Sequence, residues 1–115
     1  MRVITGTARG RVLRTLEGED VRPTTDRVKE AVFSIIQFEI EGRRVLDLFA
    51  GSGQLGIEAL SRGAASATFV DMSKDSLSAV KYNLEHTKLG DNAKVIQTDA
   101  LSFLKLTKDK FDIVF

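Results

Sequence analysis

The chain has 115 residues, 43% of them hydrophobic, which is enough for one domain with a buried core. It has no cysteine and a single histidine, so neither a disulfide framework nor a metal site is expected. No apolar run approaches the roughly 20 residues that cross a bilayer, so a cytoplasmic protein without a membrane partner is expected.

The first sixteen residues are basic, because arginines at positions 2, 9, 11 and 14 precede the first acid, Glu17. Two short β-prone runs, residues 2–5 and 11–14, flank a glycine-bounded loop, which predicts a hairpin with a basic tip. Such a tip suits a polyanion such as RNA, although a short charge cluster is also often just a solvated surface. Residues 1–22 are interpreted as a basic extension.

A helix is expected from residue 26 to about Ile40, because Pro23 and two threonines precede it and Gly42 follows it. The apolar residues at helical spacing are predicted to face the sheet, and the charged residues between them to face solvent. The inward set is Val28, Val32, Ile35 and Ile36, and the outward set is Arg27, Lys29 and Glu30.

Residues 45–60 combine a nearly continuous apolar run, a glycine-rich turn and the start of a helix. The apolar run predicts a strand that is buried on both faces of a parallel sheet. Gly51, Gly53 and Gly56 then let a ligand approach the backbone at the beginning of the next helix, which runs to about Arg62. The spacing is weak evidence by itself, since structural turns share it.

Strands and helices alternate in the remaining sequence, which predicts βαβ units in an α/β domain. The expected strands are residues 66–70, 94–97 and 111–115. Ser73 is a candidate N-cap for a helix that runs to about Lys88, and a short helix is expected across residues 101–106. Tyr82 and Phe103 are expected to be packing residues rather than base-stacking platforms. Residues 23–115 form the expected ligand-binding core.

Three acids, Asp47, Asp71 and Asp99, follow or end successive predicted strands, and ligands of such sheets bind at this edge. Asp47 would oppose a pyrophosphate by roughly 4 kcal/mol at 4 Å. It would instead attract the ammonium and sulfonium of S-adenosylmethionine, so this cofactor is favoured over NAD. Asp71 is placed to accept from ribose hydroxyls, and Asp99 from the adenine amino group. Both acids could instead be helix N-caps.

The sequence also resembles a known family, the RsmD-type methyltransferases that modify a guanine N2 in small-subunit ribosomal RNA. The resemblance covers nearly the whole chain. The matching segments are residues 1–6, 8–11, 22–33, 45–53 and 55–64. The run Arg22-Pro23-Thr24-Thr25 before the helix is more specific than the glycine motif, which many methyltransferases share.

The resemblance implies the N-terminal half of a Rossmann-like class I methyltransferase fold, with sheet order 3-2-1-4, preceded by a β-hairpin and helix. It implies S-adenosylmethionine as the cofactor, and ribosomal RNA or a small-subunit ribosomal particle as the partner. The candidate cofactor residues are Asp47, Phe49, Gly51, Gly53, Asp71, Met72, Asp99 and Ala100. The candidate RNA contacts are Arg9, Arg11, Arg14 and Arg22. Gln54 stands where family members often have a smaller residue.

The family continues beyond a strand like residues 111–115 into a catalytic Asp/Asn-Pro-Pro-Tyr motif, which this sequence does not contain. The chain is therefore expected to be a truncated, cofactor-binding portion without catalytic residues. Its last strand would form an open apolar edge, through which it could self-associate. Two other readings remain open: an NAD-dependent oxidoreductase half-domain and a non-catalytic RNA-binding module.

Overall fold

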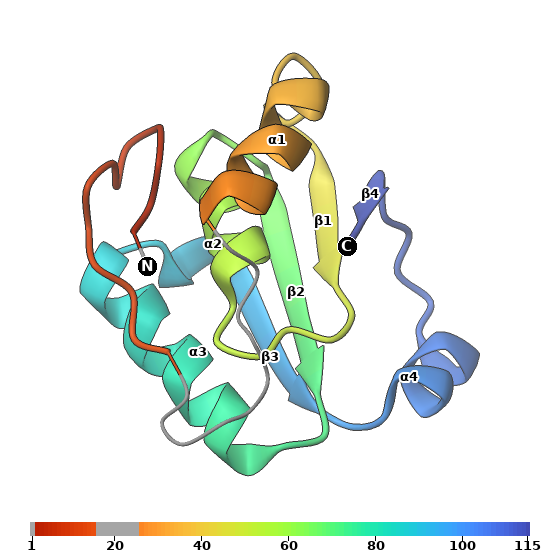
Figure 1. Ribbon diagram of the computed structural model, residues 1–115. Coiled ribbons are helices and arrows are strands. Elements are labelled where there is room, and N and C mark those ends of the chain that lie inside the picture. The colour runs from red at the N-terminus through yellow and green to blue at the C-terminus, as the bar shows by residue number, and fades with distance from the viewer. Residues whose placement is uncertain (1, 16–25) are drawn as a thin grey trace.

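The computed structural model describes residues 2–15 and 26–115, which form a four-stranded parallel sheet with helices on both faces (Figure 1). The strand order β3-β2-β1-β4 confirms the predicted order. The elements are α1 (Asp26–Ile36), β1 (Arg44–Asp47), α2 (Gln54–Ser61), β2 (Ser66–Asp71), α3 (Lys74–Thr87), a 3₁₀ turn η1 (Gly90–Asn92), β3 (Ala93–Gln97), α4 (Ala100–Leu106) and β4 (Ile113–Val114).

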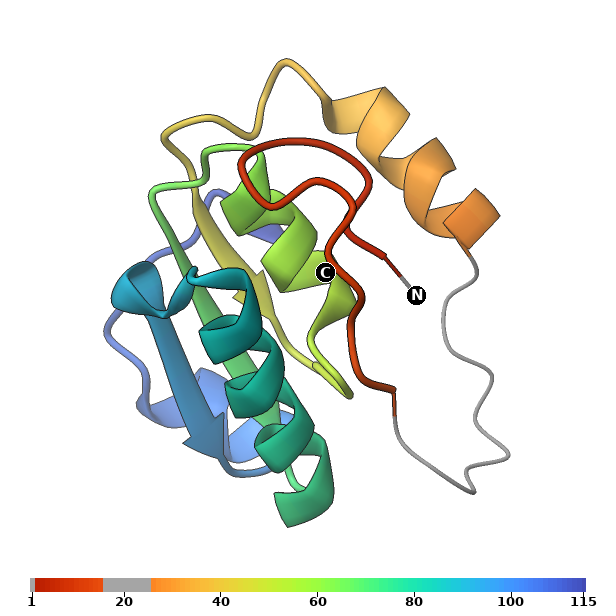
Figure 2. The same ribbon diagram turned by 90° about the vertical axis from the view of Figure 1, so that its left-hand side faces the viewer.

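The sheet has two apolar faces, as the continuous apolar runs predicted. One face is covered by α2, α3 and the N-terminal segment, and α4 lies on the other (Figure 2). Phe69 of β2 is fully buried in the larger core, on the side of α2. Leu46, Val70 and Phe103 form a smaller core under α4, where Phe103 packs as expected.

The N-terminal segment is only partly a hairpin, because a single antiparallel bridge joins Arg2 and Val12. Its side chains are nevertheless anchored, since Val3, Ala8 and Leu13 are buried in the larger core. Ser61, at the end of α2, supplies further contacts: its Oγ accepts from Ala8 N–H at 3.0 Å and donates to the Thr5 carbonyl at 2.7 Å. Packing onto α2, rather than a ladder of strand hydrogen bonds, therefore holds this segment.

Helix α1 ends four residues earlier than expected, at Ile36, where the Glu39 N–H donates to the Ile36 carbonyl at 2.8 Å. The predicted inward face was partly wrong, although Ile36 packs against the core as expected. Val28 and Ile35 are 52% and 82% exposed, whereas Lys29 is fully buried together with Phe33. A lysine at an inward position requires a buried partner of opposite charge, which hydrophobic periodicity does not register.

The partner of Lys29 is Glu58 of α2, which is also fully buried. The Glu58 carboxylate lies 3.1 Å from Lys29 Nζ, accepts from Arg62 Nε at 2.8 Å, and accepts from the N–H groups of Ile4 and Thr5 at 2.8 and 3.1 Å. Burial alone would raise the pKa of Glu58, but the Ile4 N–H, Arg62 and Lys29 outweigh it and lower that pKa. This Glu58 cluster joins three segments that are distant in sequence.

The end of the chain packs less than its sequence suggested. Strand β4 comprises Ile113 and Val114 instead of residues 111–115, and it pairs with β1. In α4, Leu101, Leu104 and Leu106 are all more than half exposed.

Among the described residues no helix is long and apolar enough to cross a membrane. Self-association through the β4 edge stays a prediction, as does the boundary between residues 1–22 and 23–115, which lies outside the described residues.

The Glu58 cluster predicts a large asymmetry between two identical substitutions. Lys29→Met should lower the free energy of unfolding by about 3 to 5 kcal/mol, because it leaves Glu58 buried with less compensation. Lys94→Met is the matched control: its ion pair with Asp109 has side chains 68% and 55% exposed, so a change below about 1 kcal/mol is expected. Urea unfolding of both variants measures the difference, and equal effects would contradict the assigned role.

Candidate cofactor site

The candidate site lies at the carboxyl edge of the sheet, where the turn after β1 leads into α2 (Figure 1). The turn is tied to the neighbouring strand, because the Ala50 N–H donates to the Val70 carbonyl at 3.0 Å. It closes on itself through the Gly53 N–H, which donates to the Ala50 carbonyl at 2.8 Å. These backbone bonds hold the turn in place without any ligand.

Each of the three glycines of the motif is explained by a different feature of its surroundings. A Cβ on Gly56 would lie 2.4 Å from Phe69 Cε1, so this residue is required by helix packing against β2. Gly53 has a φ of +86°, and its Cβ would be crowded by Val80, Ile57 and Phe69 at 3.2 to 3.3 Å. Gly51 has a φ of +56° and no neighbour within 4 Å of a built Cβ. Space for a ligand therefore lies at Gly51.

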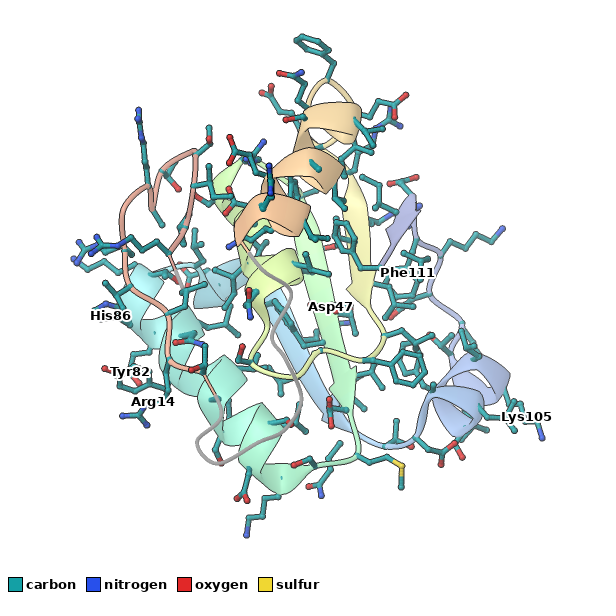
Figure 3. All side chains as sticks on the ribbon, in the orientation of Figure 1. Arg14, Asp47, Tyr82, His86, Lys105 and Phe111 are labelled. Carbon is teal, nitrogen blue, oxygen red and sulfur yellow. The ribbon has the colours of Figure 1, made fainter. Side chains whose placement is uncertain are left out.

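Asp47 ends β1 and lies beneath this turn, only 3% exposed (Figure 3). Its Oδ2 accepts from the Gly56 N–H at 3.1 Å, so it holds the first turn of α2. Burial raises the pKa of Asp47 to about 7, the Gly56 hydrogen bond opposes that rise, and the nearby charge of Asp71 adds to it. A cationic ligand would favour the ionised form of this acid.

Asp71 joins the end of β2 to the glycine turn. Its Oδ2 accepts from the Gly51 N–H at 2.9 Å and its Oδ1 from the Ser73 N–H at 2.8 Å. The N-cap of α3 is Ser73, whose side chain accepts from the Ser76 N–H at 3.2 Å, so the N-cap alternative for Asp71 was wrong. The structure thus brings Asp71 and Gly51 together, as a shared ligand site requires.

Asp99 is the N-cap of α4, which confirms the structural alternative for this residue. Its two oxygens accept from the Ser102 N–H at 2.8 Å and from the Ser102 hydroxyl at 2.7 Å. These two hydrogen bonds lower the pKa of Asp99. The end of β3 is also joined to β2, because the Thr98 N–H donates to the Asp71 carbonyl at 3.1 Å. A contact between Asp99 and adenine stays a prediction.

Three apolar residues were predicted to line the site. Phe49 and Met72 are 77% and 70% exposed, and Ala100, at the start of α4, is half-buried. Large apolar side chains with this exposure, on the turns that follow β1 and β2, could cover the flat face of a bound ring.

The sequence reasoning missed Gln54, the first residue of α2, as a site residue. It is 7% exposed, and its Oε1 has no hydrogen-bond partner among the described residues. An unsatisfied buried acceptor costs roughly 1 to 3 kcal/mol, so a ligand donor would be favourable there. The only sequence signal was that a large polar residue follows Gly53, where a smaller one is often found.

The predicted RNA-contact residues that the structure describes lie in two different environments. Arg9 and Arg11 are exposed on the N-terminal segment. The guanidinium carbon of Arg14 lies 3.9 Å from the centre of the Tyr82 ring on α3. Tyr82 is 43% exposed, so it packs against Arg14 at the surface and not in the core. Arg22 lies outside the described residues.

Two cavities of the described residues lie away from this site. One of about 440 Å³ is lined by Arg44, Ser66, Asp91 and Lys94, at or near the amino ends of β1, β2 and β3. Another, of about 480 Å³, borders the end of α3 and η1. Ligands of parallel sheets bind at the opposite, carboxyl edge, so neither cavity is assigned to the cofactor. No group of three or more potential metal ligands occurs among the described residues.

The strand order, the turn after β1 and the similarity to solved methyltransferases together show a Rossmann-like class I methyltransferase fold. A solved structure called "Putative methyltransferase yhhF from Escherichia coli" matches all of this chain and 62% of its own, with a TM-score of 0.90 and 43% identity.

The chain belongs to the family described as Conserved hypothetical protein 95, whose model matches residues 1–115. Among its relatives, "Ribosomal RNA small subunit methyltransferase D" of Escherichia coli is 44% identical over 115 residues, which is 100% of this chain and 58% of the relative. "Putative rRNA methyltransferase YlbH" of Bacillus subtilis is 50% identical over 100 residues, or 87% and 54% of the two chains. The chain thus spans little more than half of these relatives.

The raised pKa of Asp47 predicts a pH-dependent stability. The folded pKa of about 7 exceeds the ordinary value of 3.8, so protonated Asp47 stabilises the folded state relative to ionised Asp47. This contribution to the free energy of unfolding is complete below pH 4 and is lost as the pH rises through about 7. The loss amounts to at most about 4 kcal/mol. Asp47→Asn cannot ionise, so the difference in unfolding free energy between it and the wild type should shift by a few kcal/mol between pH 5 and pH 8. Parallel pH profiles in urea unfolding would contradict the shift.

Proposed function

We propose that this protein transfers the methyl group of S-adenosylmethionine to N2 of a guanine in small-subunit ribosomal RNA, and that the present chain is its cofactor-binding portion. The observation that carries the proposal is the hydrogen bond between Asp71 and the Gly51 N–H, which places an acid beside the open glycine turn. The name of the Escherichia coli relative supports a ribosomal RNA substrate.

The residues present fit the cofactor. The methionine end of the cofactor carries an ammonium and a carboxylate. Buried Asp47 would attract the ammonium, and the open backbone at Gly51 leaves room for it. The orphaned Gln54 Oε1 could accept one further N–H. When bound, S-adenosylmethionine supplies an electrophilic methyl group. Asp71 would hold the ribose, with the adenine near Phe49, Met72, Asp99 and Ala100.

The RNA side of the proposal rests on exposed positive charge. Arg9, Arg11 and Arg14 lie on the N-terminal segment, which α2 anchors through Ser61 and Glu58. Cations on a fixed support position a phosphate backbone without reading its sequence. We propose ribosomal RNA, alone or within a small-subunit particle, as the partner, and the cytoplasm as the location.

Cofactor binding tests the first half of the proposal. Asp71→Ala should weaken S-adenosylmethionine binding by about 1.5 to 3 kcal/mol, since hydrogen bonds to charged groups are lost. Asp75→Ala is the control, because Asp75 is exposed in the first turn of α3. Calorimetry measures both. Tight NAD binding without any response to S-adenosylmethionine would instead support an oxidoreductase, and binding of RNA but of neither cofactor would support an RNA-binding module.

Salt dependence tests the second half. Replacing Arg9, Arg11 and Arg14 together by alanine should flatten the dependence of RNA affinity on salt by roughly 0.7 to 0.9 for each lost phosphate contact. Matched and unmatched RNA sequences should be affected alike. Lys105→Ala is the control, because Lys105 lies on α4, away from the N-terminal segment (Figure 3). An unchanged slope in the triple variant would identify these arginines as ordinary solvated charges.

Methyl transfer itself requires residues that position the guanine amine, and none were assigned in this chain. We expect labelled methyl groups to reach ribosomal RNA only with a version extended through the family's next motif, because a misplaced reactant can cost several kcal/mol of barrier. Efficient transfer by the 115-residue chain would show that catalytic residues lie within it.

A further inference from the structure

Three exposed side chains form a layered group on the outer side of α3. The Arg14 guanidinium lies over the Tyr82 ring, at 3.9 Å from its centre. Tyr82 is also stacked with His86, with ring centres 5.9 Å apart and planes inclined by 12°. Figure 3 shows the three side chains together on one flank of the molecule, away from α4. We call this group the stacking surface.

Arg14 is held from its backbone as well as from its side chain. Its N–H donates to Asn83 Oδ1 at 2.7 Å, and its carbonyl accepts from Asn83 Nδ2 at 2.9 Å. Asn83 is fully buried and also donates to the Ser52 carbonyl at 3.0 Å. Arg9 and Arg11 are exposed, and their side chains make no hydrogen bond or ion pair within the described residues. Arg14 therefore loses less conformational freedom than they do when it binds a ligand.

The chemistry of the surface fits a nucleotide. A guanidinium that stacks on a ring keeps its N–H edges available for a phosphate, and aromatic faces accept a base by stacking. Lys81 and Glu85 directly precede Tyr82 and His86 in α3, and Lys88 is the C-cap of the helix; all three are exposed, so two lysines and one acid lie close to this group in the sequence. A flat, cationic and aromatic surface of this kind favours an anionic partner that also carries rings.

We propose that Arg14, Tyr82 and His86 bind one unpaired nucleotide of the RNA substrate, with Arg14 on the phosphate and the aromatic rings beside the base. The nucleotide must be unpaired, because bases inside a duplex are stacked on their neighbours and cannot reach a protein ring. This inference rests on the proposed RNA substrate. It adds a second contact region, on α3 rather than at the cofactor edge, and gives Arg14 a role different from that of Arg9 and Arg11.

The chain carries its own reporter for this surface, since Tyr82 is its only tyrosine and it has no tryptophan. Tyrosine emission excited at the red edge of the absorption therefore comes from one position. Titration with a single-stranded RNA ten-mer should quench this emission in step with binding, which is followed separately by the anisotropy of a labelled ten-mer. A duplex RNA of equal length should bind through its phosphates with little quenching.

Variants separate stacking from charge. Tyr82→Leu should weaken single-stranded RNA binding by about 5- to 150-fold, the range for loss of one stacked base, and should affect duplex binding less. Arg14→Ala removes a phosphate contact and should weaken both. Tyr82→Phe keeps the ring and should retain affinity. Arg43→Ala and Phe38→Leu are matched controls, because both side chains are exposed elsewhere. Circular dichroism checks that each variant is folded.

The outcomes separate this inference from the proposed function. If the wild type binds single-stranded RNA without quenching, or if Tyr82→Leu binds it normally, the stacking surface is overturned while the RNA substrate stands. If Tyr82→Leu weakened single-stranded and duplex binding equally, the stacking surface would also be overturned, since that result reports no preference for an unpaired base. Cofactor binding without any RNA binding would overturn the proposed substrate together with this surface.

Discussion

The arrangement of the N-terminal segment and α1 on α2 depends first on the buried carboxylate of Glu58. This side chain receives hydrogen bonds from the backbone of the N-terminal segment and from Arg62, and it pairs with Lys29 of α1, which is fully buried as well. A buried carboxylate demands partners, because leaving one unpaired costs several kcal/mol. The cluster therefore fixes where α1 and the arginine-bearing segment sit on α2, the same helix that begins at the glycine turn. The candidate cofactor and RNA regions share this support.

Local patterns were sufficient for the sheet and for most helix ends. The apolar runs of β1 and β2, the cap at Ser73 and the alternation of elements predicted strands and helices that the structure contains, and the family resemblance implied their order in the sheet. Local patterns failed in part at α1, where Val28 and Ile35 are exposed. Hydrophobic periodicity locates a buried face only when that face is apolar, and in α1 the buried face includes Lys29. Its ion pair with Glu58 links positions 29 residues apart, which no local pattern records.

Part of the geometry of the candidate site could be predicted from the sequence. Asp71 beside Gly51 followed from the strand ends and the glycine spacing. Asp99 had two readings from the same position, and its hydrogen bonds to Ser102 satisfy the structural one. The contact of Tyr82 with Arg14 was not predicted, because helical spacing within α3 does not record which distant segment packs on its outer side. Gln54 was missed because an unsatisfied acceptor is a property of its surroundings.

Asn83 has a consequence for how the two regions communicate. Its amide donates to the Ser52 carbonyl, within the glycine turn, and to the Arg14 carbonyl, at the edge of the stacking surface. One side chain thus spans both regions, and it cannot move at one end without disturbing the other. Any coupling free energy that it carries is reciprocal: whatever factor a bound cofactor contributes to RNA affinity, bound RNA must return to cofactor affinity. An amide buried for structural reasons would then set how strongly each of the two ligands favours binding of the other.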